Sequence, residues 1–139
     1  MRYLGLDLGT KTLGISMSDK TNTLVSPYKV LRFEFEDYES ILDEVDNIIK
    51  DYDIWKVVLG FPKNMDGSIG FAGERSLKFK ELLNKREIDV ILFDERLTTK
   101  MAEWIIHQNN EKVKNTKKKI DSIAASIILE EYLKGLKWY

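Results

Sequence analysis

The feature that most constrains this 139-residue chain is an aspartate inside its first apolar segment. In the segment Arg2–Leu8, three leucines alternate with Tyr3, Gly5 and Asp7, which predicts a strand with the leucines on one face. A carboxylate among apolar side chains is costly unless it is paired or binds a cation. We therefore expect a sheet whose first strand gives Asp7 a partner or a ligand.

The segments that follow predict one mixed α/β sheet. Residues 2–8 and 13–18 are expected to form a hairpin, and residues 23–33 a third strand at the sheet edge, because Pro27 cannot donate to a ladder. Strands and helices then alternate, as in sheets with parallel pairs. The later expected elements are a helix capped by Asp37 and running to Ile49, a strand at 55–60, a helix at 73–85 with Leu77, Leu82 and Leu83 inward, a strand at 89–94, a helix from Thr98 or Thr99 to His107, and a helix at 117–136.

Composition excludes several classes of protein. The 43% hydrophobic content is ordinary for a folded soluble protein, and we expect a single domain over residues 1–139. The absence of cysteine excludes disulfides and thiolate metal sites, and the single histidine excludes multi-histidine sites. No long apolar run or signal-peptide pattern is present, so we expect a cytoplasmic protein with no membrane partner.

Charge is unevenly distributed, although the formal net charge is only −1. Residues 34–53 are densely acidic, with Lys50 as the one basic residue. Residues 112–119 contain five lysines and no acid. Such a run either steers a phosphate backbone towards one side of the protein or is simply solvated surface, and the pattern leaves both interpretations open.

Three carboxylates are candidates for a metal site. Ligands of open α/β sheets bind beyond the carboxyl ends of the strands, where Asp7 and Glu95 are expected. Asp121 shares a helical line with Ala124 and Ala125, which are small enough to let the helix approach the sheet. Asp121 could instead interact with the helix dipole. Carboxylates are preferred ligands of Mg²⁺ and Mn²⁺, and pairs of such ions hydrolyse phosphodiesters.

Other polar groups near the same edge could contact a phosphate or border the site. Each is equally compatible with a plain role in a turn. The candidates are the backbone amides of Gly9 and Thr10, the side chains of Lys11 and Arg96, and the loop residues Asn64 and Asp66.

Four blocks of sequence, named at the end of this paragraph in chain order, resemble the YqgF/RuvX family of pre-16S rRNA nucleases. The family is also described as Holliday-junction-resolvase-like. The resemblance spans nearly the whole chain. It implies a ribonuclease H-like fold, with a five-stranded mixed sheet and flanking helices. It also implies a metal-dependent nuclease that acts on structured RNA at the 5′ end of 16S rRNA. The blocks are Gly5–Lys11 with Gly14, Gly60–Ser68, Asp94–Thr99 and Asp121–Ala125.

By motif position, the resemblance implies that Asp7, Glu95 and Asp121 are the catalytic acids and the ligands of Mg²⁺ or Mn²⁺. It gives Asp94 a lesser role, as a supporting residue or an alternative ligand. One departure is Ile69, which stands where the family often has an acidic residue. Residues 70–73 then replace a more polar stretch, so substrate contacts of this loop are not carried over.

Three alternatives stay open. Resolution of branched DNA is an older proposal for the family, and symmetric cutting of two strands would need a homodimer. The sequence Asp-Leu-Gly-Thr-Lys also resembles the phosphate loop of sugar kinases, actin and heat-shock ATPases, which close two lobes over ATP where this chain has room for one. A nucleic-acid-binding module without catalysis is the third.

Overall fold

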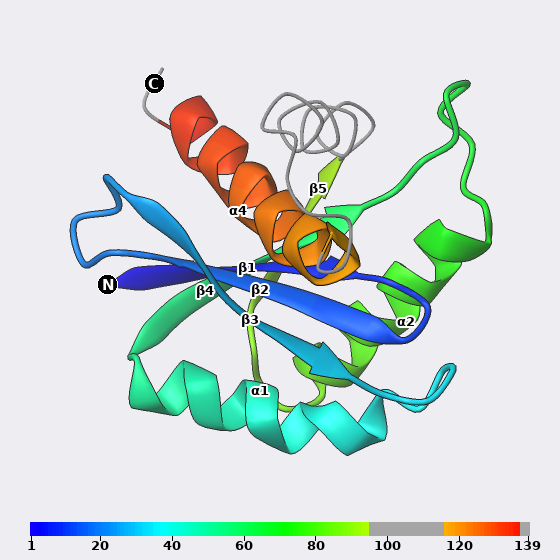
Figure 1. The fold of residues 1–139 in the computed structure, drawn as a ribbon, viewed down its shortest axis with the longest axis horizontal. Helices are drawn as coiled ribbons and strands as arrows, with labels where there is room; N and C mark the ends of the chain where they lie inside the picture. The colour runs from blue at the N-terminus through cyan, green and yellow to red at the C-terminus, as the bar shows by residue number, and fades with distance from the viewer. Residues whose placement is uncertain (95–115, 137–139) are drawn as a thin grey trace.

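The computed structural model of the chain describes residues 1–94 and 116–136, with side chains on the last helix from Asp121 onwards. Five strands form one sheet in the order β3-β2-β1-β4-β5, shown in Figure 1. The pairs β1–β2 and β2–β3 are antiparallel, whereas β1–β4 and β4–β5 are parallel. The elements are β1 (Arg2–Leu8), β2 (Thr12–Ser18), β3 (Val25–Arg32), α1 (Glu39–Asp51), β4 (Ile54–Phe61), α2 (Phe71–Asn84), β5 (Val90–Asp94) and α4 (Thr116–Leu136).

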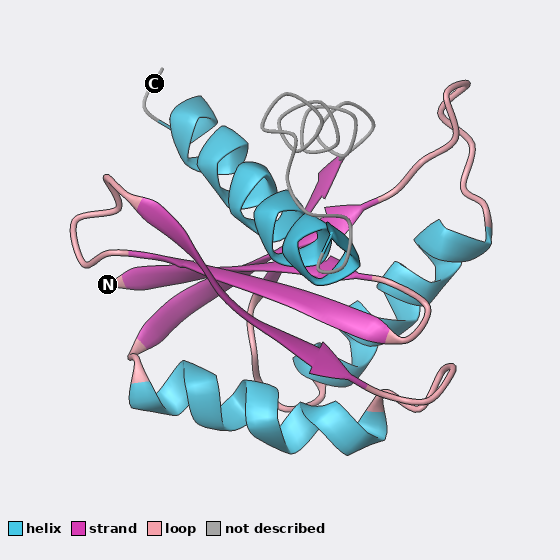
Figure 2. Ribbon diagram, viewed as in Figure 1, coloured by secondary structure: helices cyan, strands magenta, loops and turns pink. Residues whose placement is uncertain are grey.

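The mixed sheet and the position of Pro27 on the edge strand β3 confirm the expected fold class. Helices α1 and α2 cover one face of the sheet, and α4 lies across the other (Figure 2). Leu4 and Leu6 are fully buried in the core beneath α1 and α2. Tyr3 packs instead with Ile128 of α4. The alternation along β1 therefore separates two cores, as its sequence predicts.

Helix α1 does not use Asp37 as its cap, which corrects the sequence expectation. The N-cap position is Tyr38, and no side chain caps the helix. The Tyr38 ring is only 2% exposed and meets the rings of Phe33 and Phe79 edge to face, at centroid distances of 5.5 and 5.6 Å. Asp37 instead closes a turn, its N–H donating to the carbonyl of Glu34. Burial of an aromatic ring thus sets where this helix begins.

The inward face of α2 differs from the expected one at Leu77, which is 39% exposed. Gly73, Ser76, Phe79 and Leu83 form the buried face at helical spacing. Leu77 lies about 100° around the helix from Ser76 and so points away from that face. The expectation holds for Leu83, and for Leu82, which is partly buried against the same core.

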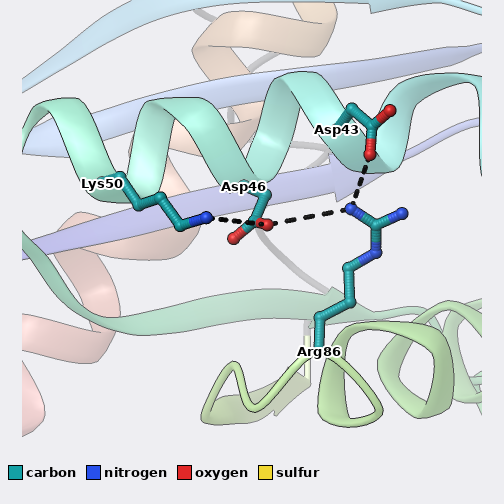
Figure 3. Close-up of polar contacts among 4 residues, drawn as sticks. All are labelled: Asp43, Asp46, Lys50 and Arg86. Carbon is teal, nitrogen blue, oxygen red and sulfur yellow. Dashed lines mark hydrogen bonds and ion pairs between the residues drawn. The ribbon is translucent and has the colours of Figure 1, made fainter.

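An arginine at the end of α2 ties this helix to α1. The Arg86 guanidinium lies 2.8 Å from the Asp43 carboxylate and 3.8 Å from that of Asp46, which also pairs with Lys50 (Figure 3). Ion pairs at a surface contribute about 0–1 kcal/mol each. This cluster therefore orients α1 and α2 more than it stabilises them.

Within the part of the chain described, no helix is both long and apolar enough to cross a membrane. The last helix begins at Thr116, close to the expected start. The helix expected from Thr98 or Thr99 to His107, and residues 112–115 of the lysine run, lie outside the described residues. The backbone of residues 116–119 belongs to α4.

Candidate active site

Asp7 and Asp121 come together around a glycine. Gly14 is the direct cross-strand partner of Asp7, and such partners share one face of the sheet. A Cβ placed on Gly14 would lie 3.1 Å from the Cβ of Asp121, and would overlap the carbonyl of that residue. Helix α4 therefore rests on Gly14, beside Asp7. Both aspartates are half-buried on the α4 face of the sheet.

This close approach depends on small residues along both elements. A Cβ on Gly5 of β1 would lie 2.8 Å from the carbonyl oxygen of Ala125. The hydroxyl of Ser16 in β2 donates to that same carbonyl at 2.8 Å. Ala124 and Ala125 are both buried. The small residues Ala124 and Ala125 thus let the backbone of α4 pack against the backbones of β1 and β2. This confirms the expected approach of the helix to the sheet.

Thr12 holds the carboxylate of Asp121, an interaction that the sequence reasoning missed. The Thr12 hydroxyl donates to Oδ2 of Asp121 at 2.7 Å. Thr12 is the first residue of β2, and strand alternation puts it on the same face as Gly14 and Ser16. Strand alternation alone could have placed the Thr12 hydroxyl on the face of Gly14, but its contact with Asp121 depends on the position of α4.

The helix-dipole interpretation of Asp121 does not hold. Helix α4 begins at Thr116, so Asp121 is its sixth residue. The dipole acts on charges within the first turn. Asp121 is instead held towards the sheet by the hydroxyl of Thr12.

The carboxyl ends of β1, β4 and β5 lie at the same edge because these strands are parallel. Asp94, the last residue of β5, pairs in register with Phe61. The Phe61 ring reaches towards Gly73 of α2, so Asp94 lies on the face opposite Asp7. Glu95 and Arg96, the next residues in sequence, lie outside the described residues. Among the side chains described, no three Asp, Glu or His residues are grouped as a metal site.

The turn between β1 and β2 uses one of the amides that the sequence offers to an anion. The N–H of Gly9 donates to the carbonyl of Thr12 at 2.7 Å, so the expectation that it faces a phosphate is wrong. The Gly9 N–H is already used, because its bond to Thr12 closes the turn. Thr10 and Lys11 are exposed at its tip. The carbonyl of Lys11 accepts from the N–H of Phe33, which connects this turn to the segment after β3.

Asn64 and Asp66 lie on the loop that leaves the carboxyl end of β4, where both side chains bond to Ser68 of the same loop. The Asn64 amide donates to the Ser68 hydroxyl at 2.9 Å. Ser68 in turn donates from its hydroxyl and its backbone N–H to Asp66, at 2.6 and 2.9 Å. These bonds lower the pKa of Asp66. The loop begins at the expected edge and extends away from the sheet (Figure 1). These side-chain bonds organise the loop itself.

Comparison with known proteins identifies the relatives of this chain. A family model described as RuvX, Holliday junction resolvase, matches residues 1–135. The chain belongs to the RuvX family. This RuvX-family chain is 42% identical over 137 residues to a Bacillus subtilis (strain 168) protein named "Putative pre-16S rRNA nuclease", covering 98% of this chain and 99% of that protein. A Caldanaerobacter subterraneus subsp. tengcongensis protein of the same name is 43% identical over 141 residues, with 99% of each covered.

Solved structures support the fold of this RuvX-family chain. RuvC of T. thermophilus in complex with a Holliday junction matches with a TM-score of 0.57 at 11% identity, covering 99% of this chain and 96% of that one. The Fowlpox virus resolvase with Holliday junction DNA matches with a TM-score of 0.58 at 15% identity, covering 98% and 99%. At such identities the likeness concerns the fold alone, and it confirms the ribonuclease H-like class.

Proposed function

We propose that this protein is a divalent-metal-dependent nuclease that hydrolyses phosphodiester bonds in the 5′-end processing of pre-16S rRNA. The observation that carries the proposal is the meeting of Asp7 and Asp121 on Gly14, at the carboxyl edge of the sheet. The shared name of the curated relatives, which match over nearly the full length, supports rRNA as the substrate.

The residues present fit Mg²⁺ or Mn²⁺. Asp7 and Asp121 offer hard oxygen donors on one face, and two carboxylates held close together repel each other unless a cation lies between them. Asp94, the last residue of β5, lies at this edge of the sheet, and we assign Glu95, the next residue in the sequence, as the third ligand. When bound, such a cation activates water and stabilises the negative charge on a reacting phosphate.

The chain's own residues prepare this site. By donating to Oδ2 of Asp121, Thr12 fixes the orientation of that carboxylate, as outer hydrogen bonds do for metal ligands. Gly14 sets the distance between helix and sheet, since any side chain there would push α4 away. The exposed ammonium of Lys11, on the turn after β1, attracts the phosphate backbone towards the carboxylates.

Cleavage of a precursor RNA that carries the 16S 5′ end tests the proposal. We expect activity with Mg²⁺ or Mn²⁺ and none after chelation. Asp7→Asn and Asp121→Asn should each lower the cleavage rate more than about a hundredfold, because even outer-shell partners of a metal site contribute 10–100-fold. The matched control is Asp51→Asn, on an exposed carboxylate at the end of α1, which should cleave normally. Cleavage by Asp7→Asn at the wild-type rate would reject the proposal.

Resolution of branched DNA is a second candidate, favoured by the description of the family model and by the two resolvase structures. A four-way DNA junction tested beside the RNA precursor, under the same metal conditions, separates the two. Symmetric incision of a junction would also require a two-fold dimer, which light scattering in the presence of the junction would reveal.

A further inference from the structure

A small pocket lies at the same edge of the sheet as the carboxylates, on the side of α2. It has a volume of about 170 Å³. One wall is Glu36, on the segment between β3 and α1, and the rest comes from the first two turns of α2. The lining residues are Glu36, Phe71, Glu74, Arg75 and Lys78.

The aromatic ring in this pocket is unusually open to solvent. Phe71, the first residue of α2, is 81% exposed, the highest value among the large hydrophobic residues described. A phenylalanine left in water at this position contributes nothing to the core. Its flat face is available for a planar ligand.

Charged groups surround that ring. Arg75 and Lys78 follow Phe71 by four and seven residues, so all three lie on one side of α2. Glu36 and Glu74 add two carboxylates. The pocket therefore combines a stacking surface, two cations suited to a phosphate, and two acceptors suited to the amino groups of a base.

We propose that this pocket binds one unpaired nucleotide of the substrate strand. The base stacks on Phe71, Arg75 and Lys78 neutralise its phosphate, and a carboxylate of Glu36 or Glu74 accepts from its exocyclic amino group. Unpaired nucleotides are required because bases within a duplex already stack on one another and cannot reach a protein ring. The identity of the strand rests on the proposed nuclease function.

The position of the pocket relative to the carboxylates supports one continuous strand. The turn after Asp7 is bonded to the N–H of Phe33, three residues before Glu36. The segment that carries Glu36 is therefore anchored to the turn that follows Asp7, where Lys11 is exposed. A strand that crosses the turn can contact Lys11 and fill the pocket while a nearby phosphate meets Asp7 and Asp121.

A protein partner fits this surface less well. Glutamate and lysine are depleted at the centres of protein–protein interfaces. Three of the five residues that line this pocket are of these two types, namely Glu36, Glu74 and Lys78.

Binding of fluorescently labelled single-stranded RNA, measured by anisotropy with a chelator present, tests the proposal without cleavage. We expect Phe71→Ala to weaken binding about tenfold and Phe71→Trp to preserve it, because stacking depends on an aromatic face. The matched control is Leu24→Ala, which removes another exposed apolar side chain (68% exposed, against 81% for Phe71) from the β2–β3 hairpin, at the opposite edge of the sheet. It should bind as the wild type does.

Two further variants test the charges. Arg75→Ala and Lys78→Ala should each reduce the slope of log affinity against log salt by about 0.7, the value for one lost contact to a single strand. Circular dichroism melts of all variants would show that these surface changes leave the fold intact.

The outcomes separate this proposal from the nuclease function. If Phe71→Ala binds single-stranded RNA as tightly as the wild type, the pocket proposal is overturned, whatever happens to cleavage. The pocket proposal is also overturned if Phe71→Ala binds RNA normally and loses only an interaction with another protein. If Phe71→Ala weakens RNA binding but neither the wild type nor any variant cleaves RNA with metal, the pocket proposal stands and the nuclease function falls.

Discussion

The two faces of the sheet are built on different principles. Beneath α1 and α2, large side chains such as Leu4, Leu6 and Leu59 fill the space between sheet and helices. Beneath α4, near the carboxyl end of β1, the contact is made by Gly14 and by polar groups from Thr12 and Asp121. The first face stabilises the fold through buried area. The second face has its own apolar core, with Tyr3, Val58 and Ile128, but near the carboxyl end of β1 it places backbone and carboxylate oxygens at fixed positions. Predictions that separate stability from site geometry test this contrast.

The largest effect on stability is expected on the leucine face. Leu6→Ala removes a fully buried side chain and should lower the free energy of unfolding by about 2–5 kcal/mol. Denaturant unfolding measures this loss. Titration calorimetry of the folded variant with Mn²⁺ should give a metal affinity close to that of the wild type. A collapse of metal affinity in a folded Leu6→Ala protein would contradict the separation of the two faces.

On the α4 face, Gly14→Ala should affect metal binding more than stability, the reverse of Leu6→Ala. The added methyl overlaps the backbone of Asp121, so α4 must shift, at a cost of about 1–3 kcal/mol typical of overpacking. Because the shift moves Asp121 away from Asp7, Mn²⁺ binding and cleavage should both be lost while the protein still folds. Ala125→Gly on the same face adds no atoms and serves as a control. Normal Mn²⁺ affinity in Gly14→Ala would show that the two carboxylates do not act together.

A smaller effect on stability, with a specific effect on the site, is expected for Thr12. Thr12→Val keeps the shape but removes the hydroxyl that donates to Asp121. Stability should fall by about 1 kcal/mol, and metal affinity by about 10–100-fold. Thr12→Ser restores the donor and should restore the affinity. Equal Mn²⁺ affinities for the valine and serine variants would exclude a positioning role for Thr12.

The smallest effect on stability is expected for the exposed ion pairs between α1 and the residue Arg86 after α2. Arg86→Ala breaks the ion pairs with Asp43 and Asp46, which are worth about 0–1 kcal/mol because they are open to solvent and screened by salt. In thermal melts, the melting temperatures of the wild type and Arg86→Ala should converge as the salt concentration rises, because salt screens the ion pairs. A loss above about 2 kcal/mol, unchanged by salt, would mean that the arginine holds α1 and α2 together through packing.

Local expectations failed where a distant contact outweighed a local preference. Asp37 has the side chain of a good N-cap, but burial of Tyr38 fixes the start of α1 one residue later. Leu77 is apolar, yet the register of α2 gives its buried side to Ser76 and Phe79. Neither of these outcomes is visible within a short window of sequence. The amide of Gly9 is a different case, because it bonds locally, to the carbonyl of Thr12 in its own turn.

The sequence by itself determined the order of strands and helices, the alternation that separates Leu4 and Leu6 from Tyr3, and the edge position of Pro27. Periodicity and proline chemistry act between near neighbours, so they can be predicted from the chain alone. It also proposed Asp7, Glu95 and Asp121 as one site. The roles of the three remain predictions, and Glu95 lies outside the described residues.

Only the tertiary structure decided that Asp7 and Asp121 share one place. They are more than a hundred residues apart in sequence, and their meeting depends on strand register and on the depth to which α4 sinks onto Gly14. It also revealed the hydroxyl of Thr12 as the partner of Asp121. Such contacts form only when helix and sheet pack at a fixed distance. Gly14 allows that short distance because it has no side chain, and this matters only once α4 packs against it.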